Sequence, residues 1–157
     1  MSSSSVAPRS HARLRVGVTS AVAAGAVLGG VVLSSQAQAA TPTYGAKAIK
    51  VAAAKKGAPY RWGAVGPTRF DCSGLTLYSF KKVGKSLPRT AQQQYSKVRH
   101  ISASQRQVGD LVFFHSGSHV YHVGIYAGAG KIWHAPHTGA VVRLERIWTK
   151  SVWYGRA

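Results

Sequence analysis

Cys72 is the one cysteine among 157 residues, so this chain cannot form an intramolecular disulfide. It follows Asp71, a residue type that caps helix starts, and it precedes an apolar run from 75 to 83 with helical spacing. The pattern predicts a helix with Cys72 in its first turn. Because the unpaired N–H groups and the dipole at a helix start favour a thiolate over a thiol, we expect Cys72 to be a reactive nucleophile.

A thiolate nucleophile needs a base nearby, and the base needs an orienting partner. With three acidic residues in the chain, no carboxylate is obviously available for orientation, whereas six histidines follow residue 40. His122 and His134 lie on the two arms of a predicted hairpin that turns at 127–130. If Tyr126 pairs with Gly130, His122 lies opposite His134 on the same face, with Cβ atoms ~5 Å apart.

These positions predict a site formed by Cys72, His122 and His134. Cys72 would attack a carbonyl carbon, His122 would take the thiol proton and give it to the leaving amine, and His134 would fix the tautomer of His122. The backbone N–H of Cys72 is a candidate oxyanion donor. The other histidines are expected to be solvated, structural or at the rim of the site: His100, His115, His119 and His137.

The elements that must position these residues change type along the chain. Helices are predicted in the first half, at 44–56, 72–83 and 91–95. Strands are predicted in the second half, at 110–114, 120–126, 131–135, 140–143 and 152–156. A helical turn is predicted at 145–150. Gly124, on the predicted His122 face, would leave room for the Cys72 helix. Helices followed by consecutive hairpin strands predict an α+β fold in which N-terminal helices pack on an antiparallel β-sheet.

Residues 1–40 have the composition of a secretion signal peptide. Three arginines precede an Ala/Val/Gly-rich stretch at 16–33, and a small-x-small cleavage pattern ends at Ala39. The stretch would span a membrane poorly, which disfavours a retained anchor. We therefore expect one catalytic domain at 41–157 in a protein that is secreted, extracellular or associated with the cell wall. A free thiol kept in that oxidising setting suggests use.

The formal net charge is +18, of which +15 falls on 41–157, because the first 40 residues hold three arginines and no acid. A field of this sign attracts polyanions. Outside a cell these are anionic cell-wall polymers or lipid head groups. Nucleic acid would bind only through non-specific phosphate contacts, so no specific nucleic-acid partner is expected. We expect a monomer without a cofactor.

Six short motifs, in this order, resemble those of the NlpC/P60 cysteine peptidases. They are Pro59-Tyr60-Arg61-Trp62-Gly63, Phe70-Asp71-Cys72-Ser73-Gly74-Leu75, Leu87-Pro88-Arg89-Thr90, Gly109-Asp110-Leu111-Val112-Phe113-Phe114, His122-Val123-Gly124-Ile125-Tyr126 and Trp133-His134-Ala135-Pro136. The resemblance runs from about Tyr44 to the end of the chain. It implies a papain-like fold with the cysteine on a helix and the histidine on the adjoining sheet.

The resemblance also implies a reaction and a set of site residues. The family cleaves peptidoglycan stem peptides, most often between D-glutamate, through its γ-carboxyl, and a diamino acid such as meso-diaminopimelate. Cys72 matches the nucleophile, His122 the base and His134 the third polar residue. Four further residues match the substrate site or its neighbouring motif: Tyr60, Asp71, Ser73 and Arg89.

Three other interpretations stay open at this point. His119, His122 and His134, with Cys72, could hold a metal ion, although no His-Glu-x-x-His motif is present. A non-enzymatic cationic protein that binds cell walls or membranes would explain the charge but not the Cys and His spacing. A CHAP-like amidase or an acyltransferase would use the same Cys and His pair on another bond.

Overall fold

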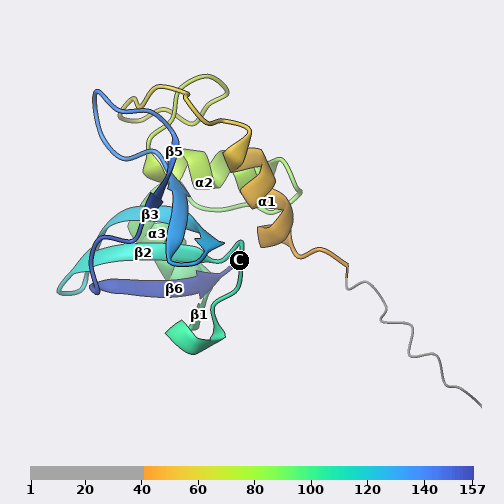
Figure 1. The fold of residues 1–157 in the computed structure, drawn as a ribbon, viewed down its shortest axis with the longest axis vertical. Helices are drawn as coiled ribbons and strands as arrows, with labels where there is room; N and C mark the ends of the chain where they lie inside the picture. Colours follow the sequence, from red (N-terminus) through yellow and green to blue (C-terminus); the bar gives the residue numbers. More distant parts are fainter. Residues whose placement is uncertain (1–40) are drawn as a thin grey trace, which may run out of the picture. The chain divides into compact units, whose positions relative to one another are not determined.

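The computed structural model describes residues 41–157, in which helices precede a six-stranded sheet (Figure 1). The helices are α1 (Tyr44–Ala53), α2 (Cys72–Lys81), α3 (Ala91–Lys97) and a short 3-10 helix, η1 (Ala103–Gln105). The strands are β1 (Arg99–Ile101), β2 (Leu111–Ser116), β3 (His119–Gly128), β4 (Lys131–His134), β5 (Arg143–Arg146) and β6 (Val152–Arg156). The predicted signal peptide at 1–40 lies outside the described residues. Within 41–157, no helix has the length and apolar content needed to cross a bilayer.

The sheet has the strand order β1-β6-β2-β3-β4-β5, and its neighbouring strands are antiparallel. This confirms the predicted α+β class. Two sequence predictions are wrong: 140–143 is mostly loop, and 145–150 is not a helical turn. Instead, β5 spans Arg143–Arg146 and pairs with β4 along its whole length. The short strand β1, which pairs with β6, was not predicted.

Side-chain caps determine where the helices begin. The Asp71 carboxylate accepts a hydrogen bond from the Gly74 N–H (2.7 Å) and so starts α2 at Cys72, as predicted. Thr90 and Gln93 form a reciprocal capping box at the start of α3. Because Asp71 is a cap, the thiol of Cys72 lies at the tip of a helix.

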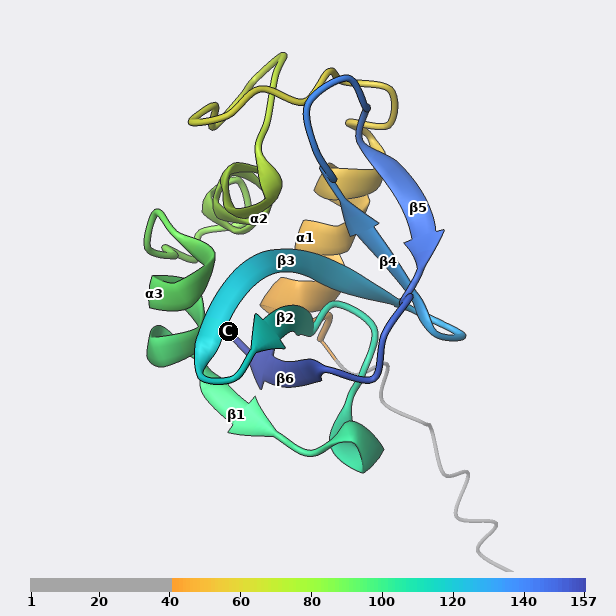
Figure 2. The same cartoon turned by 90° about the vertical axis from the view of Figure 1, so that its left-hand side faces the viewer.

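The three helices pack against β3, which Figure 2 shows as a long, strongly curved strand. The helix-facing side of the sheet carries a core cluster that includes Phe113, Val123 and Ile125, together with Leu75 and Phe80 of α2. The opposite face carries a second cluster: Val112, Phe114, Tyr126 and Ile132. The middle of β3 is therefore buried on both faces, by the helix-side cluster on one and by the second cluster on the other.

The β3–β4 hairpin differs from the predicted register by two residues. Tyr126 pairs with Ile132 rather than with Gly130, and Gly128 pairs with Lys131. The turn is therefore the two-residue Ala129-Gly130, whose φ values of 49° and 69° are those of a type I′ turn. An irregularity between Tyr126 and Gly128 accommodates Ala127 as an extra residue.

A second irregularity lies near the start of β3. Phe114 pairs with His122 but His115 pairs with Val120, so Tyr121 is an extra, bulged residue. The bulge reverses the alternation of side chains. Val120 therefore packs in the helix-facing cluster, although strict alternation along 120–126 predicts that it shares the His122 face. Gly124 is correspondingly tight against β4, because a Cβ there would lie 2.8 Å from Ile132 Cδ1, so it makes room for β4 rather than for α2.

Candidate active site

Cys72 meets β3 where that strand has an open edge. The β3–β4 ladder covers β3 from Ile125 to Gly128, which leaves the Val123 N–H on an edge that β4 does not pair. The tip of α2 packs there, and the backbone N–H groups of Val123 and Ser73 donate hydrogen bonds to the Cys72 sulfur. As the first residue of α2, Cys72 also presents a backbone N–H that the helix itself cannot use.

His122 and His134 form the buried pair that the sequence predicted, with a different strand geometry. The observed register sets His134 diagonal to His122 rather than opposite it, and both lie on the same face of the sheet. The rings are nearly perpendicular, with centroids 5.1 Å apart. His122 Nε2 and His134 Nδ1 are 2.9 Å apart, a hydrogen-bond distance. Since His122 uses Nε2 for this bond, Nδ1 is its nitrogen left for the thiol.

Two hollows flank Cys72. The first, which we call the histidine hollow, has a volume of about 410 Å³. Its walls hold the predicted catalytic residues and several aromatic and charged side chains: Tyr60, Trp62, Cys72, Tyr121, His122, His134, Pro136, His137, Arg143, Glu145 and Trp148. The second, the Arg89 hollow, has a volume of about 700 Å³ and shares Trp62, Cys72 and Tyr121 with the first. The sulfur therefore lies between two cavities that meet at exposed aromatic rings.

The thiol does not have the lowered pKa that the helix tip predicted. Burial is the largest effect and raises the pKa of Cys72, and the neighbouring negative charge of Asp71 raises it further. The hydrogen bonds from Val123 and Ser73 act in the opposite direction but do not reverse the shift. The sequence already contained the opposing signal, because the residue that caps the helix is itself an anion beside the sulfur.

The imidazole of His122 is also shifted toward its neutral form. Burial, followed by the influence of His134, lowers the pKa of His122 from 6.5 to about 3. Both shifts favour the neutral forms at neutral pH, a thiol on Cys72 and an imidazole on His122, in the same hollow. Such a pair can attack a carbonyl by passing the thiol proton to the imidazole in the same step, without a preformed thiolate–imidazolium pair.

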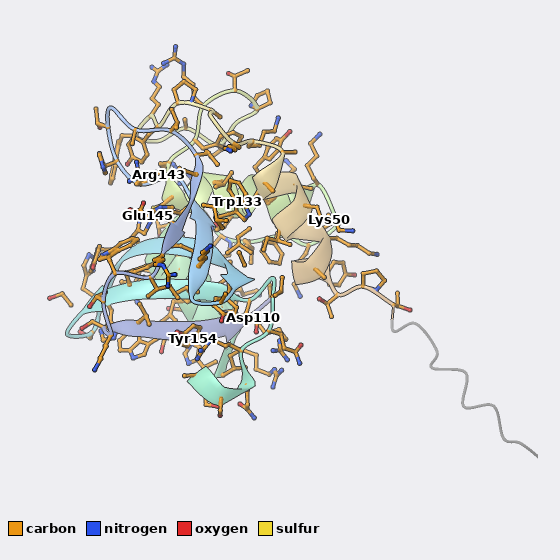
Figure 3. The ribbon with its side chains drawn as sticks, viewed as in Figure 1. Lys50, Asp110, Trp133, Arg143, Glu145 and Tyr154 are labelled. Carbon is orange, nitrogen blue, oxygen red and sulfur yellow. The ribbon has the colours of Figure 1, made fainter. Side chains whose placement is uncertain are left out.

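Glu145 is the site residue that the sequence reasoning missed. Its Oε2 atom lies 3.0 Å from His134 Nε2 and 2.7 Å from Arg143 Nε, and all three side chains line the histidine hollow. Figure 3 labels Glu145 beside Arg143 on β5. The alternation of charged and apolar residues at 143–145 was a short strand signal that could have brought Glu145 toward the histidines.

The predicted substrate residues divide between the two hollows. Tyr60 lines the histidine hollow, whereas Asp71, Ser73 and Arg89 line the Arg89 hollow. The buried Asp71 carboxylate accepts hydrogen bonds from the Gly63 N–H (2.9 Å), the Gly74 N–H (2.7 Å) and the Arg89 guanidinium (3.1 Å to Oδ1). Asp71 is therefore a cap and an anchor in this structure, and Arg89, with its half-exposed side chain, presents the polar surface of that hollow.

The remaining histidines lie away from the central pair or at its rim. His100 stacks on Tyr95 and His115 stacks on Trp153. His119 is exposed and lines the Arg89 hollow, and His137 lines the edge of the histidine hollow. Within 41–157, no three His, Cys, Asp or Glu side chains converge as metal ligands would.

A thiol at a helix tip that lines one hollow with two hydrogen-bonded imidazoles of an antiparallel sheet is the arrangement of a papain-like α+β domain. The model of the NlpC/P60 family matches residues 57–156. The chain belongs to the NlpC/P60 family.

Curated relatives share the matched region. A "probable endopeptidase" of Corynebacterium glutamicum (strain R) is 48% identical over 103 residues, which cover 65% of this chain and 48% of that protein. "Probable endopeptidase p60" of Listeria monocytogenes is 53% identical over 91 residues, or 58% of this chain and 18% of that protein. The "bifunctional muramidase/DL-endopeptidase CwlT" of Bacillus subtilis is 45% identical over 95 residues, which cover 58% of this chain and 29% of that protein. The match thus spans about half of the first relative and less of the other two.

Solved structures share the fold. The NlpC/p60 domain of the peptidoglycan hydrolase SagA has a TM-score of 0.66 and 35% identity, over 72% of this chain and 98% of that one. RipA mutated at a cysteine has a TM-score of 0.66 and 34% identity, over 72% of this chain and 61% of that one. RipD of Mycobacterium tuberculosis has a TM-score of 0.63 and 27% identity, over 74% of this chain and 98% of that one. It is described as a non-catalytic NlpC/p60 domain protein adapted to peptidoglycan binding.

Proposed function

We propose that this protein is a cysteine endopeptidase that hydrolyses peptidoglycan stem peptides. The observation that carries the proposal is the meeting of Cys72, His122 and His134 in one hollow, with the 2.9 Å contact between the two rings. The membership in the NlpC/P60 family and the naming of its relatives as endopeptidases support the same reaction class.

The mechanism follows from the neutral resting pair. The Cys72 sulfur attacks the carbonyl carbon of an amide while its proton passes to His122, and the resulting oxyanion is stabilised by the free Cys72 N–H. Protonated His122 then gives that proton to the amine nitrogen, so that the C–N bond breaks and a thioester is left. Water, deprotonated by His122, hydrolyses the thioester to a carboxylate and restores the thiol. His134 holds the ring of His122 in the orientation that both proton transfers need.

The positions of the hollows suggest how a stem peptide lies. The leaving amine must lie near His122, which assigns the amine half of the substrate to the histidine hollow, and the acyl half to the Arg89 hollow. Arg143 and Arg89 are the arginines of these two walls, and each could meet a stem-peptide carboxylate. We propose the bond between D-glutamate, through its γ-carboxyl, and a diamino acid such as meso-diaminopimelate, and the DL-endopeptidase name of CwlT agrees with this choice.

Two structural relatives bear on whether the site is active. Structures of RipA have been solved with mutations at a cysteine, a histidine and a glutamate, which lie 49 and 12 residues apart. Cys72, His122 and His134 lie 50 and 12 residues apart, so His134 has the spacing of the mutated glutamate. RipD, by contrast, is described as non-catalytic. The complete Cys–His–His set favours catalysis in this chain over binding alone.

We also propose that the protein acts outside the cytoplasm, as a secreted or wall-associated monomer. The supporting observations are the signal-like composition of residues 1–40 and the charge of +15 over 41–157, which favours retention by anionic wall polymers. Fractionation of a culture, followed by release of the protein from walls with salt, tests both. Its recovery in the cytoplasm with residues 1–40 still attached would refute the location.

The experiment that tests the activity is digestion of purified peptidoglycan by the purified protein, with mass spectrometry of the products. Cleavage between glutamate and the diamino acid is expected, and it should be blocked by iodoacetamide but not by EDTA. Cys72→Ala should abolish cleavage with an unchanged circular dichroism spectrum, whereas Ser79→Ala, a control in the same helix, should keep it.

Three outcomes would contradict the proposal. Turnover by pure Cys72→Ala would overturn the assignment of Cys72 as the nucleophile. Products from another amide bond would favour an amidase. No cleavage, together with tight binding to walls, would favour a cationic wall-binding protein.

A further inference from the structure

We propose that Glu145 is a positioning residue that fixes which ring nitrogens of His134 and His122 carry protons, so that the bare nitrogen of His122 is the one left for Cys72. The inference rests on the proposed function, because it assigns to Glu145 the task of preparing the base of that reaction. It extends the site by one member, Cys72–His122–His134–Glu145, beyond the three residues that the motifs identify.

Strand pairing brings Glu145 to the far side of His134. In the β4–β5 ladder, Arg143 lies opposite His134 and Glu145 lies opposite Ile132. Residues that lie opposite in an antiparallel pair share a face, and so do residues two apart on one strand. Glu145 is therefore a diagonal neighbour of His134 on the same face, at the range that a long side chain can bridge. The 3.0 Å contact from Oε2 to His134 Nε2 is the result.

The carboxylate is kept ionised by its other neighbour. Arg143 Nε donates a hydrogen bond of 2.7 Å to the same Oε2 atom. The Arg143 hydrogen bond is the largest influence on the pKa of Glu145 and lowers it, and the hydrogen bond from His134 lowers it further. An ionised carboxylate has acceptors and no proton to donate. The hydrogen bond between Glu145 and His134 therefore has one possible direction.

The direction of that bond determines the direction of the next hydrogen bond, between His134 and His122. His134 must donate from Nε2, and because burial lowers the pKa of His134 and keeps its ring neutral, its Nδ1 atom carries no proton. Nδ1 of His134 must then accept from Nε2–H of His122, at 2.9 Å. Neutral His122, with its proton on Nε2, has a lone pair on Nδ1, which is what a base facing a thiol requires. One carboxylate thus selects the working tautomer of a ring it does not touch.

The other two carboxylates among the described residues have different surroundings. Asp71 caps α2 and pairs with Arg89, and Asp110 accepts from the Gln107 N–H and pairs with Arg156 near the start of β2. Glu145 pairs with an arginine in the same way but also contacts a buried imidazole. Its side chain is 38% exposed, so its replacement removes little packing. Figure 3 labels Asp110 well apart from Glu145, so Asp110, which also pairs with an arginine, is a control for the loss of a carboxylate charge.

The test replaces Glu145 by glutamine in the full chain. A glutamine amide can offer either an N–H or an oxygen to His134, so the tautomer is no longer imposed. We expect kcat to fall about 10- to 100-fold while KM changes less than about 3-fold, since a charge-assisted hydrogen bond that acts through the base is lost. The thermal midpoint should change little. Asp110→Asn, which removes a carboxylate charge just before the start of β2, should keep kcat once its folding is verified by circular dichroism.

A second readout does not depend on activity. In the ¹⁵N NMR spectrum of the histidine rings at neutral pH, His134 and His122 should each show a protonated Nε2 and a bare Nδ1, with assignments from His122→Gln and His134→Gln. Glu145→Gln should replace this pattern by a mixture. A protonated Nδ1 on His122 in the native protein, or an unchanged spectrum together with unchanged kcat in Glu145→Gln, would overturn the inference.

Two further outcomes separate the inference from its alternatives. Arg143→Gln could reproduce the whole loss of kcat seen in Glu145→Gln while its histidine spectrum keeps the native pattern. In that case Glu145 acts by holding Arg143, and the inference is wrong. If the native protein cleaves no peptidoglycan at all, the proposed function fails, but the ring spectra still decide whether Glu145 sets the tautomers.

Discussion

The buried and neutral state of His122 should make the fold sensitive to acid in a way that a single variant can isolate. In the unfolded chain the imidazole has its ordinary pKa of 6.5, and in the folded protein burial and His134 lower that pKa to about 3. Between these values the unfolded state binds a proton that the folded state excludes. The free energy of unfolding therefore falls as the pH is lowered from 6.5 toward 3, and this loss is absent above pH 6.5.

The size of the effect follows from the two pKa values. Each pH unit inside the window removes about 1.4 kcal/mol, so His122 alone lowers the free energy of unfolding by about 3 kcal/mol between pH 8 and pH 4. The full shift corresponds to about 5 kcal/mol. This is a large part of the stability of a small domain, for which 5–15 kcal/mol is typical.

Urea unfolding of the native protein and of His122→Gln, followed by tryptophan fluorescence from pH 8 to pH 4, measures the difference. Glutamine does not titrate and can still donate a hydrogen bond to His134 Nδ1. The pKa values of His134 and Glu145 are also lowered, so these residues also reduce the free energy of unfolding in acid. They do so in both proteins, and their contributions cancel to first order in the difference. The native protein should lose about 3 kcal/mol more than the variant. If the free energy of unfolding fell equally with pH in both proteins, the inference that His122 is buried and neutral would be refuted.

Two substitutions in α2 should change stability in opposite directions. Among the described residues, the hydroxyl of Ser79 is buried without a hydrogen-bond partner, so Ser79→Ala should raise the free energy of unfolding by about 1 kcal/mol, and a lower urea midpoint would contradict this. A Cβ on Gly74 would lie 2.0 Å from the Ala64 carbonyl oxygen and 2.9 Å from Asp71 Oδ1. Gly74→Ala should therefore lower the free energy of unfolding by about 3 kcal/mol, and it should slow hydrolysis because the loop that contains Ala64 must shift. Stability equal to that of the native protein would contradict this prediction.

The parts of this fold that could be predicted are those that neighbouring residues determine. Asp71 and Thr90 each reach an N–H within three residues, so their helix starts follow from the local sequence. The apolar strand at 111–114 is similarly clear. The family motifs then relate the helix to the sheet, which no local signal does.

The parts that were wrong depend on choices between near-equivalent local structures. The stretch from Ala127 to Gly130 alternates alanine and glycine, so several turns fit it, and the type I′ turn at Ala129-Gly130 moved the register by two residues. The bulge at Tyr121 had no sequence signal either. The contact between His134 and Glu145 required the correct assignment of β5, which depends on pairing with β4 rather than on local propensity.

The short length of β4 has a consequence for how the protein avoids unwanted association. A strand with unpaired N–H groups on one side is a template for another strand, and such edges promote aggregation. Pro136, two residues after the end of β4, has no N–H to contribute to a longer ladder. The segment of β3 left uncovered is protected instead by side chains and helix tips, since Gln92 accepts from the Val120 N–H at 2.7 Å and the Cys72 sulfur accepts from Val123. The same unpaired stretch that would pair with a foreign strand is thus occupied by the Cys72 thiol, so a longer β4 would compete with that thiol for the edge of the sheet.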